Sequence, residues 1–174
     1  MPRKTSWHEI AKEALKEIGK EWGYAVSESE KEMVFATKFR MFRHRLYGKG
    51  NEIIKGGASE RKPHVLSYKP DVVWKKGRNY RAIFEIEFLD ERKSGIEKRK
   101  YAIGSLMLAY LAMVEKSVEE LYFVTNNESL CREISTFKQI IPLKHEDCTY
   151  TLFLSAQNPP HIKRGLQEFL STHF

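Results

Sequence analysis

Three acidic residues, Asp71, Glu85 and Glu87, are spaced so that they could act together on one substrate. They lie in two runs of β-branched and aromatic residues that flank the basic, glycine-containing stretch 75–79. This pattern predicts a β-hairpin with its turn centred on Arg78. Antiparallel pairing about that turn places Asp71 opposite Glu85.

The alternation of side chains along the second run separates the acids from an apolar face. Glu85 and Glu87 share one face with Ile83. A one-residue slip in the pairing would exchange the faces of one strand, so the apolar pattern itself favours this register. The other face is apolar throughout and collects Val72, Trp74, Ala82, Phe84, Ile86 and Phe88.

Three carboxylates on one patch of a hairpin need a reason to be there, because like charges placed opposite one another destabilise a sheet. No lysine or arginine separates Glu85 from Glu87. A divalent cation between the acids would relieve the repulsion, and oxygen ligands suit Mg²⁺ or Mn²⁺. The alternative is a hairpin with one face in water, where the acids are simply solvated.

The residues Pro70-Asp71 and Glu85-Ile86-Glu87 resemble the signature of the PD-(D/E)xK nuclease superfamily, whose fold is that of restriction endonucleases. The resemblance implies that Asp71 and Glu85 bind the metal ion and that the Ile86 backbone carbonyl is a further ligand. Glu87 stands where the family has lysine. It would accept a proton from the attacking water or bind a second metal ion.

This departure from the family pattern leaves two hypotheses. Some restriction enzymes of the family carry glutamate at the lysine position and cleave DNA, which predicts a metal-dependent DNA endonuclease. Degenerate members also lose the lysine, which predicts an inactive nuclease fold that binds nucleic acid or a protein partner. Metal-dependent cleavage separates the two hypotheses.

The resemblance also implies contributions from two helices. Family members often bring an extra acid from the first helix to the metal, and Glu9, then Glu13, are the candidates. Their alternative roles are a helix cap and a solvated helix face. Members without the strand lysine sometimes supply a cation from the helix that follows, where Lys98 and Lys100 are the candidates for facing the phosphate. An exposed basic first turn is the alternative.

The elements that position these residues alternate along the chain. Ser6 and Glu9 form a capping box at the start of an amphipathic helix over 6–22, and Ser94 and Glu97 form another at the start of a long apolar helix. The order α-β-β-β-α-β-α-β-α predicts one α/β domain over 1–174, a mixed sheet flanked by helices, and is the order of the restriction-endonuclease-like core. The other expected elements are a first strand at 24–27, the helix at 94–116, strands at 120–125 and 150–155, and helices at 129–140 and 159–170.

A basic insertion at about 37–69 carries a net charge of +7, which equals the formal charge of the whole chain. Aromatic residues interleave with the cations, a pattern typical of a surface that binds a phosphate backbone. Solvated surface is the alternative. Residues 34–37 fit both a strand and the start of a helical stripe. The cations expected to contact nucleic acid are Lys38, Arg40, Arg43, Arg45, Lys49, Lys55, Arg61 and Lys62.

Composition and the absence of certain motifs exclude several other classes of protein. No run of residues reaches transmembrane length, no signal region opens the chain, and two cysteines make no disulfide framework, so a cytoplasmic protein without a membrane partner is expected. Phosphate-binding loops, dinucleotide fingerprints and nucleophile elbows are absent from the sequence. The six histidines are interpreted as structural or surface residues. Duplex or branched DNA is the expected partner, and two cuts in a duplex would favour a homodimer.

Overall fold

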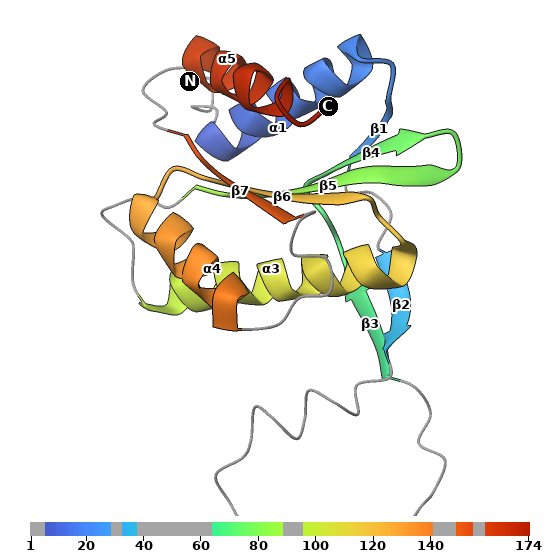
Figure 1. Ribbon diagram of the computed structural model, residues 1–174, viewed down its shortest axis with the longest axis vertical. Coiled ribbons are helices and arrows are strands. Elements are labelled where there is room, and N and C mark those ends of the chain that lie inside the picture. The colour runs from blue at the N-terminus through green and yellow to red at the C-terminus, as the bar shows by residue number, and fades with distance from the viewer. Residues whose placement is uncertain (1–5, 29–32, 38–63, 89–95, 141–148, 155–158) are drawn as a thin grey trace, which may run out of the picture.

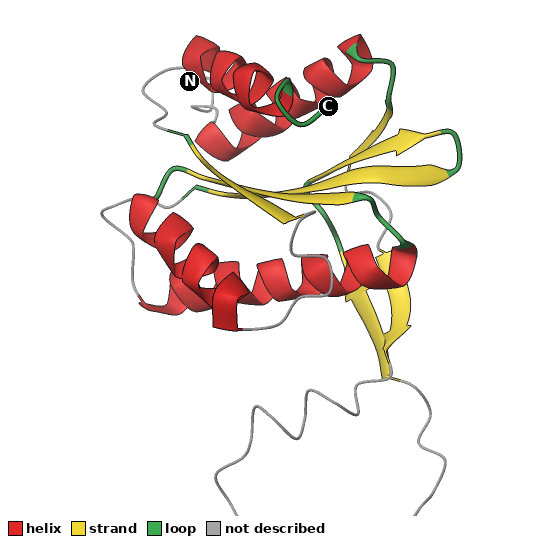
Figure 2. Cartoon of the chain, in the orientation of Figure 1, coloured by secondary structure: helices red, strands yellow, loops and turns green. Residues whose placement is uncertain are grey.

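The chain forms an α/β fold in which helices cover both faces of a five-stranded mixed sheet (Figure 1). The computed structural model describes residues 6–28, 33–37, 64–88, 96–140, 149–154 and 159–174. Helices α1 and α5 cover one face of the sheet, and α3 and α4 cover the other (Figure 2). The elements are α1 Trp7–Glu21, β1 Ala25–Glu28, β2 Met33–Thr37, β3 His64–Tyr68, β4 Val72–Lys76, β5 Asn79–Glu87, α3 Ile96–Lys116, β6 Glu120–Thr125, α4 Glu128–Ile140, β7 Thr149–Phe153 and α5 Pro159–Leu170.

The sheet has the strand order β1-β4-β5-β6-β7, with β5 in the middle. Pairing is antiparallel between β1 and β4 and between β4 and β5, then parallel from β5 to β6 and from β6 to β7. Because α3 connects the parallel strands β5 and β6, it runs antiparallel to both. The carboxyl end of β5 and the N-terminal end of α3 therefore lie at the same edge of the sheet.

The β4–β5 hairpin has the predicted register from Val72 to Trp74, but beyond Trp74 the pairing shifts by one residue, so the turn is not centred on Arg78 as predicted. Val72 pairs with Phe84 and Val73 with Ile83, so the residue before β4, Asp71, continues the ladder toward Glu85. The turn is formed at positions 77 and 78, where a glycine adopts a φ of 63°. A register shift between residues 74 and 75 lets the strands close around this tight turn.

The predicted alternation of side chains in the hairpin is present, and it divides the core into two clusters. Val72, Trp74 and Phe84 pack under α1 and α5, whereas Val73 and Ile83 pack with α3 and α4. Helix α3 buries one side against the sheet, including Ala102, Leu106, Ala109, Ala112 and Met113. None of the helices in the described ranges combines the length and the apolar character needed to cross a membrane.

Helix α1 begins and ends where its sequence signals lie. The Ser6 Oγ accepts a hydrogen bond from the Glu9 backbone N–H, which caps the first turn. After the last turn, Gly23 adopts a φ of 80° and lets the chain reverse into β1. The capping box expected at Ser94 lies outside the described residues.

A second sheet of two strands, β2 and β3, stands beside α3 (Figure 1). Met33 pairs with Tyr68 and Thr37 with His64 in antiparallel register. The choice left open for 34–37 is thus decided in favour of a strand, and β3 was not anticipated within the basic insertion. Residues 38–63, which carry the cations expected to contact nucleic acid, lie outside the described residues.

Gly19 fixes how closely α1 approaches the sheet. A Cβ at this position would lie 2.5 Å from Trp74 Nε1 and 2.8 Å from Val26 Cγ2. The same indole donates a hydrogen bond to the Leu15 carbonyl at 3.1 Å, and a displacement of the ring would strain this bond. Gly19→Ala is therefore expected to lower the free energy of unfolding by about 1–3 kcal/mol, the usual cost of overpacking.

Chemical denaturation of Gly19→Ala and of a second helical variant, Gly104→Ala, checks this expectation. Gly104 in α3 has open space where its Cβ would be, so Gly104→Ala should raise stability by about 0.5–1 kcal/mol. Equal effects of the two alanines would contradict the close approach of α1.

Candidate active site

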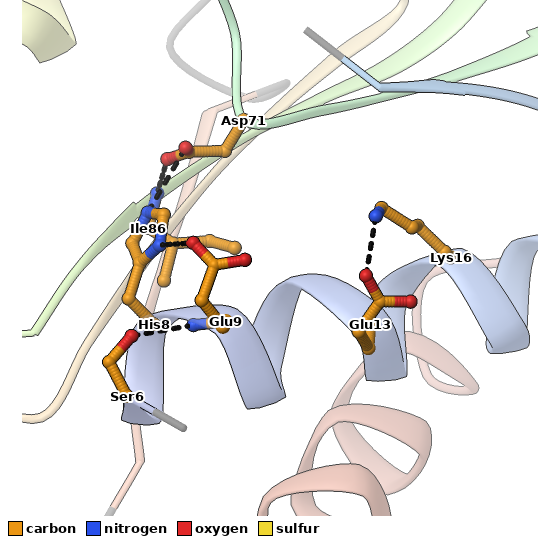
Figure 3. Close-up of polar contacts among 7 residues, drawn as sticks. All are labelled: Ser6, His8, Glu9, Glu13, Lys16, Asp71 and Ile86. Atoms are coloured by element: carbon orange, nitrogen blue, oxygen red, sulfur yellow. Dashed lines mark hydrogen bonds and ion pairs between the residues drawn. The ribbon is translucent and has the colours of Figure 1, made fainter. Parts of the chain in front are cut away.

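Asp71 lies directly before β4 and contacts two other elements, β5 and α1 (Figure 3). Its Oδ2 accepts a hydrogen bond from the Ile86 backbone N–H at 2.9 Å. Its Oδ1 lies 3.0 Å from Nε2 of His8, in the first turn of α1. The carboxylate is partly buried, with 18% of its side chain exposed. Asp71 is thus fixed in place between the central strand and the first helix.

Glu85 lies in the central strand and is the buried acid of the site, with 7% of the residue exposed. The Tyr68 hydroxyl donates a hydrogen bond to Oε2. The Ser105 hydroxyl of α3 donates to Oε1 at 2.6 Å. Each oxygen of the Glu85 carboxylate therefore has a donor, one from the end of β3 and one from α3, and its orientation is fixed from two sides.

The pKa of Glu85 is raised by burial and, to a smaller extent, by neighbouring negative charge. Burial is the main cause that raises its pKa to about 7, and the charge of Asp71 is the next cause. The hydrogen bonds from Ser105 and Tyr68 act in the opposite direction, and the charge of Glu87 adds to the rise. Near neutral pH the site therefore holds a carboxyl that readily takes up a proton or a cation.

Glu87 ends β5, two residues beyond Glu85, so both side chains leave the strand on one face as predicted. It is half-buried, and its charge reaches Glu85. In the described part of the chain, no group of three or more histidine, cysteine, aspartate or glutamate side chains is placed to hold a metal ion. Asp71 lies near enough to Glu85 for its charge to raise the pKa of Glu85, and metal binding by Asp71, Glu85, Glu87 and the Ile86 carbonyl stays a prediction.

His8 is a site residue that the sequence interpretation missed, because it was taken as structural or surface. Its Nδ1 lies 3.3 Å from Glu9 Oε1, so the imidazole bridges Glu9 and Asp71 (Figure 3). The hydrogen bond to Asp71 is the main cause that raises the pKa of His8. Glu9 reaches the site through this imidazole, whereas Glu13 forms an ion pair with Lys16 at 2.6 Å. The first helix thus presents a histidine to the acid of the hairpin.

Tyr68 and Ser105 were also missed. The signal for Ser105 was a hydroxyl within an otherwise apolar stretch of helix, where a buried polar group needs a partner. Tyr68 closely precedes Pro70-Asp71, but its contact depends on β3, which the sequence did not reveal. The side chains of the two lysines expected to face the phosphate, Lys98 and Lys100, lie outside the described part of the structure.

Comparison with known proteins adds no family to this description. The chain matches no protein-family model, no curated protein and no solved structure.

Proposed function

We propose that the chain is a metal-dependent nuclease that hydrolyses phosphodiester bonds in DNA, with a restriction-endonuclease-like fold. The observation that carries the proposal is the acid pair at the central strand. Asp71 and Glu85 approach each other at the start of β4 and the end of β5, and burial and mutual repulsion raise the pKa of Glu85 to about 7. Two acids held in this way gain most from a divalent cation.

The donor chemistry fits Mg²⁺ or Mn²⁺. These ions prefer oxygen ligands, and Mg²⁺ characteristically uses one or two carboxylates while water and substrate phosphate complete its shell. Asp71 and Glu85 would hold the ion, so a third protein carboxylate is not required. When bound, the ion supplies Lewis acidity that activates water and stabilises the charge developing on the phosphate.

The residues around the acids have distinct roles in this proposal. His8 and the Ile86 backbone N–H orient Asp71, and the hydroxyls of Tyr68 and Ser105 orient Glu85. Glu87 lies two residues along the strand from Glu85, on the same face, and would accept the proton of the attacking water. Partners of this kind commonly change metal affinity or activity 10- to 100-fold when they are removed.

DNA is proposed as the substrate because of the net charge of the chain. The chain has a formal net charge of +7, whereas the site itself is acidic. A phosphodiester would be repelled by the acids alone, and a divalent cation between them reverses that repulsion. The positive charge elsewhere on the chain favours a polyanion such as DNA.

Calorimetric titration with Mn²⁺ tests the metal site directly. Wild type is expected to bind the ion, and Asp71→Ala should lose at least about 10-fold in affinity because one of two carboxylate ligands is gone. Glu168→Ala removes a surface acid of α5 and serves as the control, expected to bind like wild type. Identical titrations of wild type and Asp71→Ala would contradict the assignment of Asp71.

One observation favours a second candidate function, an inactive nuclease fold that binds nucleic acid or a protein. All four carboxylate oxygens of Asp71 and Glu85 already interact with protein groups, as expected of acids retained for structure. Cleavage assays in Mg²⁺ and Mn²⁺ on linear, plasmid and branched DNA distinguish the two. Binding without cleavage of any of these substrates would favour the second candidate.

A further inference from the structure

Three exposed aromatic side chains surround the carboxyl end of the central strand, which we call the aromatic rim: Trp7, Tyr101 and Phe153. Their exposed fractions are 37%, 77% and 40%. The other exposed large hydrophobic residues of the described chain are Val114 and Phe174. Most of the large apolar surface left open in the described part therefore lies at the site.

Tyr101 can be placed from the contacts of α3. Ser105, which donates to Glu85, lies one turn after Tyr101, and the two positions differ by roughly 40° around the helix. The step of four residues from Tyr101 to Ser105 rises about 6 Å along α3, close to the advance of two residues along a strand. Because α3 is antiparallel to β5, Tyr101 is displaced from Ser105 in the same direction as Glu87 is displaced from Glu85. The two displacements are also of about the same length.

Phe153 is placed by the sheet register. Glu87 pairs with Thr125 on β6, and Thr125 pairs with Phe153 on β7. Adjacent strands lie about 4.8 Å apart, and β6 separates β5 from β7. The backbones of Phe153 and Glu87 are therefore roughly 10 Å apart, in one row of paired residues across the end of the sheet. Paired residues of such a row point to the same face, which here is the face of Glu85 and α3.

Trp7 approaches from the opposite face. It directly precedes His8, whose imidazole contacts Asp71, and it lies one turn before the fully buried Ala11. It therefore continues the sheet-facing side of α1 beyond the last buried turn. The three rings belong to three different elements, α1, α3 and β7.

We propose that the aromatic rim stacks unpaired bases, so that the nuclease acts on single-stranded DNA or on the single-stranded arms of branched DNA. This inference rests on the proposed function and specifies its substrate. Base stacking on separate aromatic rings, combined with a positively charged chain, is how proteins hold single strands without reading sequence. A protein interface would instead be expected to bury one contiguous apolar core. The rim is interrupted by the charged side chain of Glu87, which is partly exposed.

Binding measurements that do not depend on cleavage test the inference. The affinities of a labelled single-stranded oligonucleotide and of the blunt duplex of the same sequence are compared by fluorescence anisotropy in Ca²⁺, and the recovered DNA is run on a gel to verify that it is intact. Wild type should prefer the single strand. Tyr101→Ala and Phe153→Ala should each weaken single-strand binding by about 5- to 150-fold, the effect of losing one stacked base.

Controls separate stacking from folding and charge. Tyr101→Phe retains the ring and should bind like wild type, and Val114→Ala removes an exposed apolar group from the other end of α3 and should change nothing. The salt dependence of binding should be the same in Tyr101→Ala as in wild type, because no phosphate contact is lost. A lower affinity for the single strand, with an unchanged dependence of log affinity on log salt concentration, would therefore indicate that the variant has lost a stacking contact.

Three outcomes would overturn the inference: no preference of wild type for the single strand, alanine variants that bind the single strand like wild type, or equal losses on single strand and duplex. A rim that instead serves self-association would appear as a dimer in sedimentation that Tyr101→Ala abolishes while DNA binding is unchanged, which also overturns it. If the single strand is bound as expected but never cleaved in Mg²⁺ or Mn²⁺, the proposed function fails and the binding site remains.

Discussion

Glu87→Gln is expected to reduce DNA cleavage by about 10²- to 10⁴-fold, the range that a general base contributes. The amide has the shape of the carboxylate but takes no proton, so the variant should fold and bind DNA normally. Glu87 ends β5 at the edge of the sheet, and its side chain is partly exposed. Single-turnover cleavage in Mg²⁺ and Mn²⁺, with unfolding curves for each protein, measures the effect.

Two further variants make this test specific. Glu168→Gln neutralises an exposed carboxylate on α5, far from β5 in the sequence, and should cleave like wild type. Glu87→Lys introduces the lysine of the PD-(D/E)xK signature that the sequence resembles, and it should retain measurable cleavage because lysine can orient water from the same strand face. If wild type, Gln and Lys forms all bind DNA and none cleaves linear, plasmid or branched substrates, the nuclease proposal is wrong.

The features of the site that could be predicted from the sequence depend on residues close together in the chain. Alternation along residues 80–88 fixes which side chains share a face, and the apolar pattern then permits one register for the hairpin. The pairing of Val72 with Phe84 confirms that register. Helices α1 and α5 were predicted for the same reason, since their caps, prolines and apolar spacing lie within each segment.

The part that could not be predicted depends on contacts between distant segments. The two donors to Glu85 are 17 and 20 residues away in the chain, and His8 is 63 residues from Asp71. No periodic pattern encodes such distances. Strand β3 pairs with β2 across residues 38–63, so its existence is decided by a partner that lies far away in the sequence. Long-range pairing of this kind overrides local propensity.

The free energy of unfolding should fall as the pH rises from about 5 to 8, and Glu85 should be a main cause. Its pKa is raised from 4.5 to about 7 in the folded chain, so the folded state favours the protonated form. A raised pKa gives stability that is complete below 4.5 and is lost as the pH passes through about 7. The shift corresponds to a loss of up to about 3 kcal/mol.

Glu85→Gln isolates this contribution. The amide cannot ionise, and the hydroxyls of Tyr68 and Ser105 can both donate to its oxygen or accept from its nitrogen. The pKa of His8 is also raised, chiefly by the Asp71 hydrogen bond, so His8 adds a loss of stability as the pH rises above 6.5. The loss due to His8 occurs in both wild type and Glu85→Gln, so it cancels when their free energies of unfolding are subtracted. The gap between variant and wild type should therefore widen from pH 5 to pH 8.

Mn²⁺ connects this stability profile with the proposed function. A cation that binds the folded chain stabilises it in proportion to RT ln(1 + [L]/Kd), and binding to the Glu85 carboxylate competes with the proton. At pH 8, Mn²⁺ should therefore restore stability to wild type and have a smaller effect on Glu85→Gln. At pH 5, where Glu85 is protonated, the ion should stabilise wild type much less. Denaturation curves of both proteins at the two pH values, with and without Mn²⁺, measure all of these differences. Parallel pH profiles would contradict the raised pKa, and equal effects of Mn²⁺ on both proteins at pH 8 would exclude Glu85 as a ligand.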